Sequence, residues 1–169
     1  TGKLVKWEPM ISGSGIPQVE GEILGKLSQN WKKVLPAKFA GGFLCLLGGL
    51  SLGREGPSIQ LGAMTGQGIS RPLNRGKTEE KYIMTSGASA GLAAAFHAPL
   101  AGMMFSLEEI HKGFSVTLLV SVMTASVTAD YISSYIIGLD PVFQFRLEHV
   151  LPQNYYWLLV VLGIVLGVF

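Results

Sequence analysis

Long apolar segments, separated by short breaks rich in glycine, proline and charge, make up most of this chain. The apolar segments are residues 39–52, 82–96, 98–110, 114–137 and 154–169. Most of them are shorter than the ~20 residues that a helix needs to cross a bilayer. Short apolar segments interrupted by glycine or proline are typical of transporters that hold an ion near mid-membrane. The pattern therefore predicts broken helices, several of which end inside a membrane.

The remaining segments are more polar. An amphipathic helix of about three turns is predicted from the Gly13–Pro17 break to Gln29, and a further helix from the Gly53–Pro57 break to about Ile69. Residues 31–38 are basic and flanked by an aromatic residue, as is usual at a lipid headgroup boundary. The predicted connections and loops are residues 1–12, 70–81 and 138–153.

Composition places these helices in a membrane. Hydrophobic residues make up 49% of the 169 positions and charged residues only 14%, against about 25% charged in soluble domains. The 22 glycines suit membrane helices, and a net charge of +2 does not indicate a nucleic-acid partner. The single cysteine, Cys45, cannot form an internal disulfide. Since the chain does not begin with Met and ends inside an apolar run, we expect an internal fragment of a longer protein.

The segment Gly13-Ser14-Gly15-Ile16-Pro17 places glycine-rich backbone directly before a predicted helix. Proline is tolerated at a helix start because its missing N–H would have no partner there. Glycines let backbone amides approach a ligand closely, and a helix N-terminus favours an anion. Ser14 adds a hydroxyl donor. The segment is therefore either part of an anion site or an ordinary capped helix start.

The segment Gly53-Arg54-Glu55-Gly56-Pro57 places two charges directly after an apolar run. Ionisable groups at membrane depth are costly and indicate a functional site. At a helix start, Glu55 competes with an anion for the same donors when it is ionised and withdraws when it is protonated. Glu55 is thus a candidate gate and proton carrier. Arg54 either makes the local field more positive or bonds backbone carbonyls.

Two adjacent carboxyls, Glu108 and Glu109, follow another apolar segment. Two carboxyls close together raise the pKa of one of them, which keeps a proton available near neutral pH. The pair is therefore a candidate proton relay, and a solvated helix end is the alternative interpretation.

These motifs together resemble the CLC family of chloride channels and proton/chloride exchangers. The resemblance also rests on residues 87–102, GASAGLAAAFHAPLAG, and covers essentially the whole chain. It implies an all-α integral membrane protein of tilted and broken transmembrane helices. Residues 1–169 would then be a single membrane-domain fragment, most of the first half of an inverted repeat, without the N-terminal helices and the C-terminal half. The family implies a homodimer with one pore per subunit, a multi-pass protein of a bacterial or archaeal inner membrane.

The resemblance also implies roles for single residues. Ser14 matches a serine whose hydroxyl coordinates the central anion, Glu55 matches an external gating glutamate, and Glu109 matches an internal proton-transfer glutamate with Glu108 beside it. His97 departs from the asparagine expected at its position. The predicted anion-binding residues are Gly13, Ser14, Gly15, Ile16, Pro17, Arg54 and Gly56.

The predicted function is proton-coupled chloride antiport, with chloride, protons and the lipid bilayer as partners and with no cofactor, metal or catalytic residue. By the resemblance, the connection Lys26–Lys38 would face the cytoplasm. The connection Arg71–Lys81 would face the outside, although basic loops usually face inward.

Two alternatives stay open. A passive channel of the same family is one, and a neutral residue at position 109 would favour it. The other is an intramembrane serine hydrolase, because residues 87–91 fit the G-x-S-x-G pattern around Ser89. That motif needs a strand-turn-helix context, whereas Gly87 and Gly91 have the spacing of closely packed membrane helices.

Overall fold

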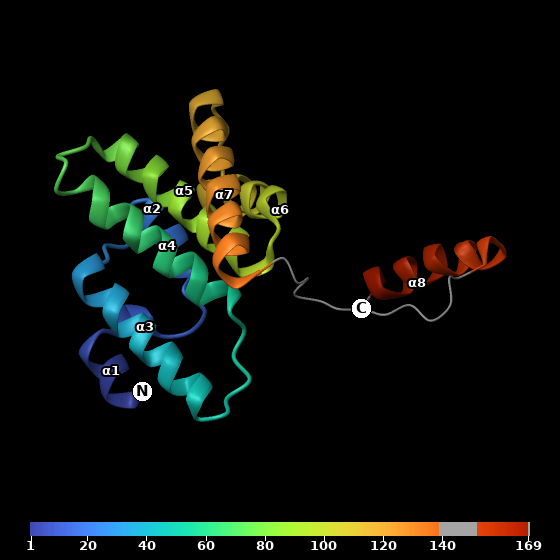
Figure 1. The fold of residues 1–169 in the computed structure, drawn as a ribbon, viewed down its shortest axis with the longest axis horizontal. Helices are drawn as coiled ribbons and strands as arrows, with labels where there is room; N and C mark the ends of the chain where they lie inside the picture. The colour runs from blue at the N-terminus through green and yellow to red at the C-terminus, as the bar shows by residue number, and fades with distance from the viewer. Residues whose placement is uncertain (139–151, 169) are drawn as a thin grey trace.

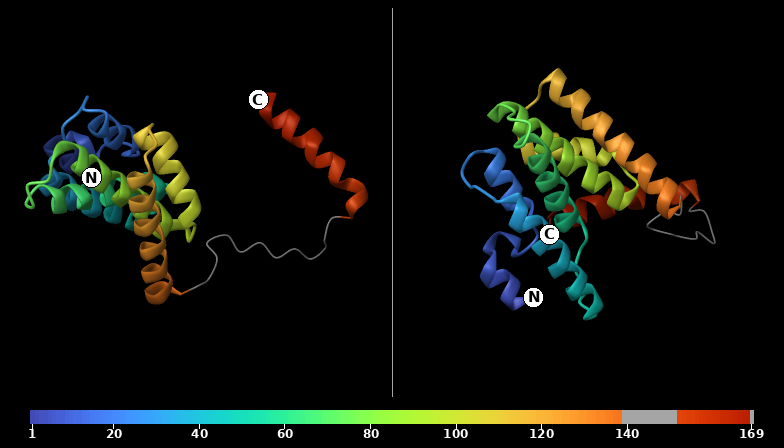
Figure 2. Two further views of the ribbon diagram at one scale, coloured as in Figure 1. Left: turned by 90° about the horizontal axis from the view of Figure 1, so that it is seen from above. Right: turned by 60° about the vertical axis from the view of Figure 1, so that its left-hand side comes forward.

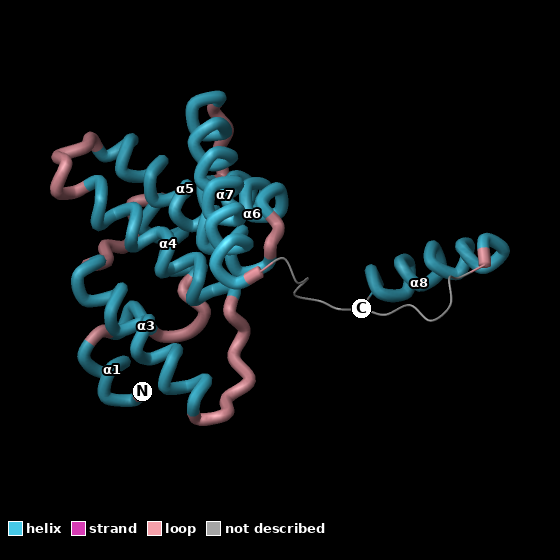
Figure 3. Tube along the Cα trace, viewed as in Figure 1, coloured by secondary structure: helices cyan, strands magenta, loops and turns pink. Residues whose placement is uncertain are grey.

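The computed structural model describes residues 1–138 and 152–168, and these residues form helices joined by short loops (Figures 1 and 3). The α-helices are α1 (Gly2–Trp7), α2 (Ile16–Ile23), α3 (Trp31–Leu47), α4 (Glu55–Ser70), α5 (Lys77–Phe96), α6 (Pro99–Phe105), α7 (Val116–Ile137) and α8 (Tyr156–Val168). The short helices of other pitch are η1 (Pro9–Ile11), the π-helix η2 (Ser106–His111) and η3 (Gln153–Tyr155).

Helix α2 is shorter than predicted. It ends at Ile23, because Gly25 takes a φ of 76° and the N–H of Lys26 bonds back to the carbonyl of Gly21 at 2.7 Å. A left-handed glycine with such a return bond is a common way to end a helix. The predicted extension of this helix to Gln29 is therefore wrong.

Helix α3 begins earlier than predicted, at Trp31, and ends at Leu47 instead of at the predicted residue 52. Residues 31–38, expected as an interface segment, form its first turns, and Asn30 caps it by accepting a hydrogen bond from the Lys32 N–H at 3.1 Å. Pro36 lies inside the helix, where proline normally disrupts the backbone bonds. Residues 1–12, expected as a polar connection, contain α1 and η1. The predicted loop 138–153 lies almost entirely outside the described residues.

Glycines bring α4 and α5 into close backbone contact. A Cβ on Gly62 would overlap the carbonyl of Gly87, and a Cβ on Gly91 would overlap the carbonyl of Ser58. The prediction that Gly87 and Gly91 serve close helix packing is thus confirmed. Around this pair, α2 and α3 contribute Val19, Ile23 and Val34 to a core shared with Ile59 and Met64 of α4.

Helix α7 is, among the described residues, the one helix long and apolar enough to cross a membrane. It packs along α5, and large apolar side chains remain exposed on its outer side, including Val120, Ile132 and Ile136. Figure 2 shows α7 beside α5, and its left view shows α8 apart from the other helices. The apolar outer surface is the one that a bilayer or further protein would cover.

The two basic connections lie on the same side of the molecule, which corrects the prediction that they face opposite sides. Arg71 Nη2 lies 3.2 Å from Glu22 Oε1 at the end of α2, and its Nη1 donates to the carbonyl of Gln29 at 3.4 Å. The α4–α5 turn therefore touches the α2–α3 turn directly. The conflict with the usual inward placement of basic loops disappears, because the two loops share one face.

Candidate functional site

The starts of α2 and α4 meet at Ser14 and Gly56. Gly15, with φ 104°, precedes α2, and a Cβ at Gly56 would overlap both the hydroxyl and the carbonyl oxygen of Ser14. Only glycine at position 56 allows this approach. The structure thus brings together two of the predicted anion-binding residues, at the point where two helices carry unpaired N–H groups.

Two cavities adjoin this meeting point, and Ser14, Glu55 and Gly56 line both of them. The first extends towards α3, with Gly13 and Pro57 also in its lining; the second extends towards α5 and α6. Glu55 is the first residue of α4, and its carboxylate lies against Gly53, where a Cβ would overlap it. The Glu55 side chain is exposed, and it belongs to the lining of both cavities.

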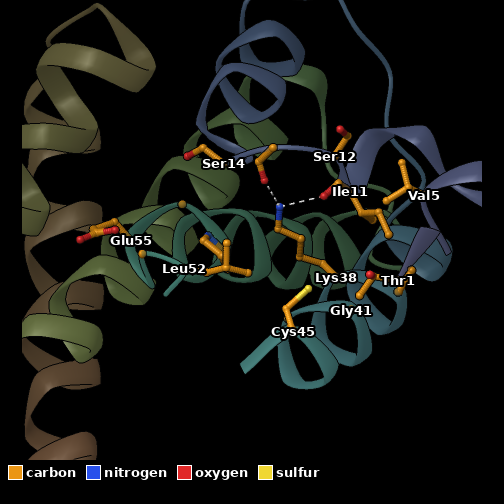
Figure 4. Close-up of a pocket in the computed structure, with 16 residues that line it drawn as sticks. Thr1, Val5, Ile11, Ser12, Ser14, Lys38, Gly41, Cys45, Leu52 and Glu55 are labelled. Carbon is orange, nitrogen blue, oxygen red and sulfur yellow. Dashed lines mark hydrogen bonds between the residues drawn. The ribbon is translucent and has the colours of Figure 1, made fainter. Parts of the chain in front are cut away.

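Lys38 of α3 supports the backbone that leads into Ser14 (Figure 4). Its Nζ donates to the carbonyls of Ile11 at 3.0 Å and Gly13 at 2.8 Å, and the side chain is only 5% exposed. We expected Lys38 to be one of several basic residues at a headgroup boundary, so its role was missed. Lys38 lies four residues after Val34 and three before Gly41, both buried on α3. This helical spacing is the sequence signal that could have placed Lys38 on the inner face.

Behind Ser14, the buried amide of Gln60 holds α4 against the loops. Its Nε2 donates to the Met10 carbonyl at 2.8 Å and to Gln29 Oε1 at 2.9 Å, and its side chain fills the space that a Cβ at Gly15 would need. This explains why Gly15 must be glycine even apart from its positive φ. Gln29 in turn donates to the carbonyl of Gln18 on α2 at 2.9 Å.

Glu22 stands at the other end of α2 in a polar cluster. It accepts hydrogen bonds from the Gln67 side chain and from the Gln29 N–H, the latter at 3.0 Å, and it pairs with Arg71. Burial raises the pKa of the Glu22 carboxyl, while Arg71 and the hydrogen bonds act in the opposite direction. The cluster fixes the end of α2 and hence the direction in which its N-terminus points.

Arg54 lies over the ring of Phe96, with its Cζ 5.2 Å from the ring centroid. This is the geometry of a cation–π contact. From the sequence we considered two roles for Arg54, a positive field at the anion site or a bond to backbone carbonyls. The contact with Phe96 at the end of α5 was not expected. Phe96 itself lines the second cavity beside Glu55.

Glu108 and Glu109 lie on η2, are exposed, and line neither cavity beside Ser14. The nearby Lys112 donates to Glu20 Oε1 at 2.6 Å, which ties the end of η2 to α2. This hydrogen bond and the charge of Glu20, with a smaller contribution from Glu109, raise the pKa of Lys112. Because α2 begins beside Ser14, this hydrogen bond joins the segment that carries Glu109 to the helix at the candidate site.

Ser89 does not occupy a nucleophile elbow. It lies within α5, is fully buried, and forms a short hydrogen bond with Ser126 of α7. A helical backbone lacks the sharp strand-to-helix turn that exposes a nucleophilic serine. The G-x-S-x-G match is thus explained by helix packing.

Broken helices, an apolar exterior and two converging helix starts are typical of integral membrane proteins of the transporter class. The sequence profile described as voltage gated chloride channel matches residues 1–169, and the chain belongs to this family. The predicted family and the all-α membrane fold are therefore confirmed.

Named relatives and a solved structure agree. The H(+)/Cl(-) exchange transporter ClcA of Vibrio cholerae is 39% identical over 168 residues, which cover 97% of this chain and 36% of the relative. ClcA of Salmonella arizonae is 36% identical, over 96% of this chain and 35% of the relative. The crystal structure of a slow cyanobacterial Cl-/H+ antiporter matches with a TM-score of 0.84 and 38% identity, over 95% of this chain and 38% of that one. The chain thus spans about a third of the length of these relatives.

Proposed function

We propose that this chain is part of a membrane protein that exchanges chloride for protons. The relatives named as H(+)/Cl(-) exchangers and the antiporter structure support this function. The proposal concerns a longer protein, since the chain spans only 36% of the first relative. We further propose that this protein is a homodimer in a bacterial or archaeal inner membrane, with both basic connections on its cytoplasmic side.

The observation that carries the proposal is the meeting of Ser14 with Gly56 between two cavities that Glu55 also lines. In our proposal, chloride binds where the Ser14 hydroxyl and the N–H groups of the α2 and α4 starts converge. Helix N-termini favour anions through their free donors and partial positive charge. Lys38 adds a cation nearby and keeps the Ile11 and Gly13 carbonyls occupied.

Glu55 is proposed as the gate. As a carboxylate at the first position of α4, it competes with chloride for the same donors, and protonation releases it. Proton and chloride movements are thereby linked at a single side chain. Glu109 is proposed as the group that exchanges protons with the opposite side, because it belongs to a segment that the Lys112–Glu20 pair joins to α2.

The test is transport by the full-length protein in liposomes under a chloride gradient. We expect uphill proton movement in the unmodified protein, and uncoupled chloride flux in Glu55→Gln and in Glu109→Gln. Glu79→Gln, a change in an exposed surface pair with Arg75, is the matched control and should leave coupling intact.

Chloride flux without any proton movement in the unmodified protein would refute the exchanger and favour the passive channel that the family description names. Loss of chloride flux in Glu109→Gln would contradict the assigned role, because that residue lines neither cavity beside Ser14.

A further inference from the structure

Asp130 is a carboxylic acid inside α7, the apolar helix long enough to cross a membrane. It is the only Asp, Glu, Lys or Arg among the 22 residues of that helix. An ionisable side chain in such a helix is costly and is retained for a function, usually with a partner. Asp130 belongs to neither cavity beside Ser14 and takes no part in the proposed exchange mechanism.

The partner of Asp130 is His97, which lies 33 positions earlier in the chain. Nδ1 of His97 is 3.1 Å from Asp130 Oδ1 and 3.2 Å from Ser134 Oγ, one helical turn further along α7. An ionised Asp130 only accepts hydrogen bonds, so Nδ1 carries the proton and donates it to the carboxylate. A third contact, from Ser133 Oγ to the Ala94 carbonyl at 3.3 Å, joins the same two helices beside this pair.

His97 also has an unusual backbone. It is the residue that ends α5, with φ 53° and ψ 44°, in the left-handed region. Apart from glycine, asparagine, aspartate and histidine are the residues that adopt this region most readily. Position 97 therefore combines two demands, a left-handed backbone that turns the chain from α5 into α6 and a side-chain donor for Asp130.

The residue before this turn connects it with the gate. The Phe96 ring lines the cavity that Glu55 and Ser14 share, and Arg54, the neighbour of Glu55, lies over the same ring. Whatever fixes the end of α5 therefore fixes Phe96, and with it the side chain of Arg54. Within the described residues, the hydrogen bond between His97 and Asp130 joins the end of α5 to α7.

We propose that His97 and Asp130 are a positioning pair that holds Phe96 and Arg54 in place beside the gating carboxylate. The inference rests on the proposed gate role of Glu55 and adds two residues to it, neither of which touches the anion site. Loss of the pair leaves the end of α5 free to shift, so Glu55 returns less often to the position in which it excludes chloride and accepts a proton.

The test separates the side-chain donor from the backbone conformation at position 97. His97→Gly keeps the left-handed turn but removes the donor, whereas His97→Asn keeps both, because its amide donates to Asp130. In liposomes with the full-length protein, we expect coupled exchange to fall about tenfold in His97→Gly, equivalent to about 1.4 kcal/mol. We expect His97→Asn to retain near-normal exchange. Ser126→Ala, which removes another α5–α7 hydrogen bond away from Phe96, is the matched control and should behave like the unmodified protein.

The same changes are then made in a Glu55→Ala background, which lacks the gate. There we expect His97→Gly to change chloride flux by less than about twofold, because a positioning effect needs the group it positions. Equal exchange rates in His97→Gly and His97→Asn would overturn the proposal, and so would a tenfold loss of flux by His97→Gly in the gateless background. If His97→Gly does not fold, Asp130→Leu serves instead, because it removes the hydrogen-bond acceptor from α7. We then expect the same fall in coupled exchange with Glu55 present, and the same small change in chloride flux without it.

The same variants distinguish failure of the gate proposal from failure of the positioning pair. If Glu55→Ala alone leaves proton coupling intact, Glu55 is not the gate, and the function proposal fails at that step. If Glu55→Ala abolishes coupling while His97→Gly and Asp130→Leu leave the rate unchanged, the gate stands and the positioning pair is refuted.

Discussion

Replacing Lys38 by methionine tests how the loop before Ser14 supports an anion. The ammonium of Lys38 lies 2.8 Å from the Gly13 carbonyl oxygen, and Ser14 is the next residue. One residue adds at most about 3.8 Å and a hydrogen bond to the anion about 3 Å, so an anion at the Ser14 hydroxyl lies within roughly 10 Å of Nζ. A unit charge at that distance contributes about 2 kcal/mol at an effective dielectric constant of ~20.

Loss of this charge should therefore weaken chloride binding roughly 30-fold. Stability should change much less. Methionine removes a buried ammonium that is costly to desolvate, while the two carbonyls it leaves face the cavity that Lys38 itself lines. Water entering the cavity can bond these carbonyls in place of Lys38. The expected signature is thus a large loss of affinity in a protein that still unfolds cooperatively at a similar temperature.

Isothermal titration of the purified full-length protein with chloride gives the dissociation constant, and thermal unfolding in detergent reports stability. Lys32→Met is the matched control, since it removes a lysine from the same helix but from its exposed side. A charge there is screened by solvent and salt, so its removal should change affinity less than threefold or so. If Lys38→Met binds chloride as tightly as Lys32→Met does, the electrostatic and loop-holding role of Lys38 is wrong.

Two further predictions concern stability. Gly62→Ala should destabilise the protein by about 3 kcal/mol or more, because its methyl group would overlap the Gly87 carbonyl. Gly42→Ala, with open space around it, should be neutral or slightly stabilising. Chemical denaturation in detergent compares the two variants, and equal effects would contradict the close α4–α5 packing. Burial raises the pKa of Glu22 above its ordinary 4.5, so its stabilising contribution is complete below pH 4.5 and is lost as pH rises through the folded-state pKa. Glu22→Gln should flatten this part of the stability profile, above pH 4.5. A profile as steep as that of the unmodified protein would show that another group titrates there.

The sequence predicted the parts of the site that depend on local backbone chemistry. Gly15 and Gly56 were expected to open helices beside an anion site, and in the structure the starts of these helices meet at Ser14. Glu55 stands at the first position of α4, as the position of Pro57 indicated. These features follow from short-range rules for glycine, proline and helix ends, which act within a few residues of the chain.

Side-chain roles that depend on distant partners were missed. Lys38 bonds carbonyls 25 and 27 positions away, and Gln60 bonds a carbonyl 50 positions away. A lysine in a basic run and a glutamine in a helix look the same in a sequence whether they face solvent or fill a core. Only packing of the helices shows which of them are buried and which groups they must then bond.

The sequence by itself determined that this is a membrane protein of broken helices, where α2 and α4 begin, and the family to which the chain belongs. Tertiary structure alone decided that both basic connections share one side, that Arg54 rests on Phe96, and that His97 meets an acid in α7. The physical reason is that the backbone preferences of a segment are set by its own residues. A salt bridge or ring contact between α4, α5 and α7 exists only after the glycines of α4 and α5 have brought those helices together.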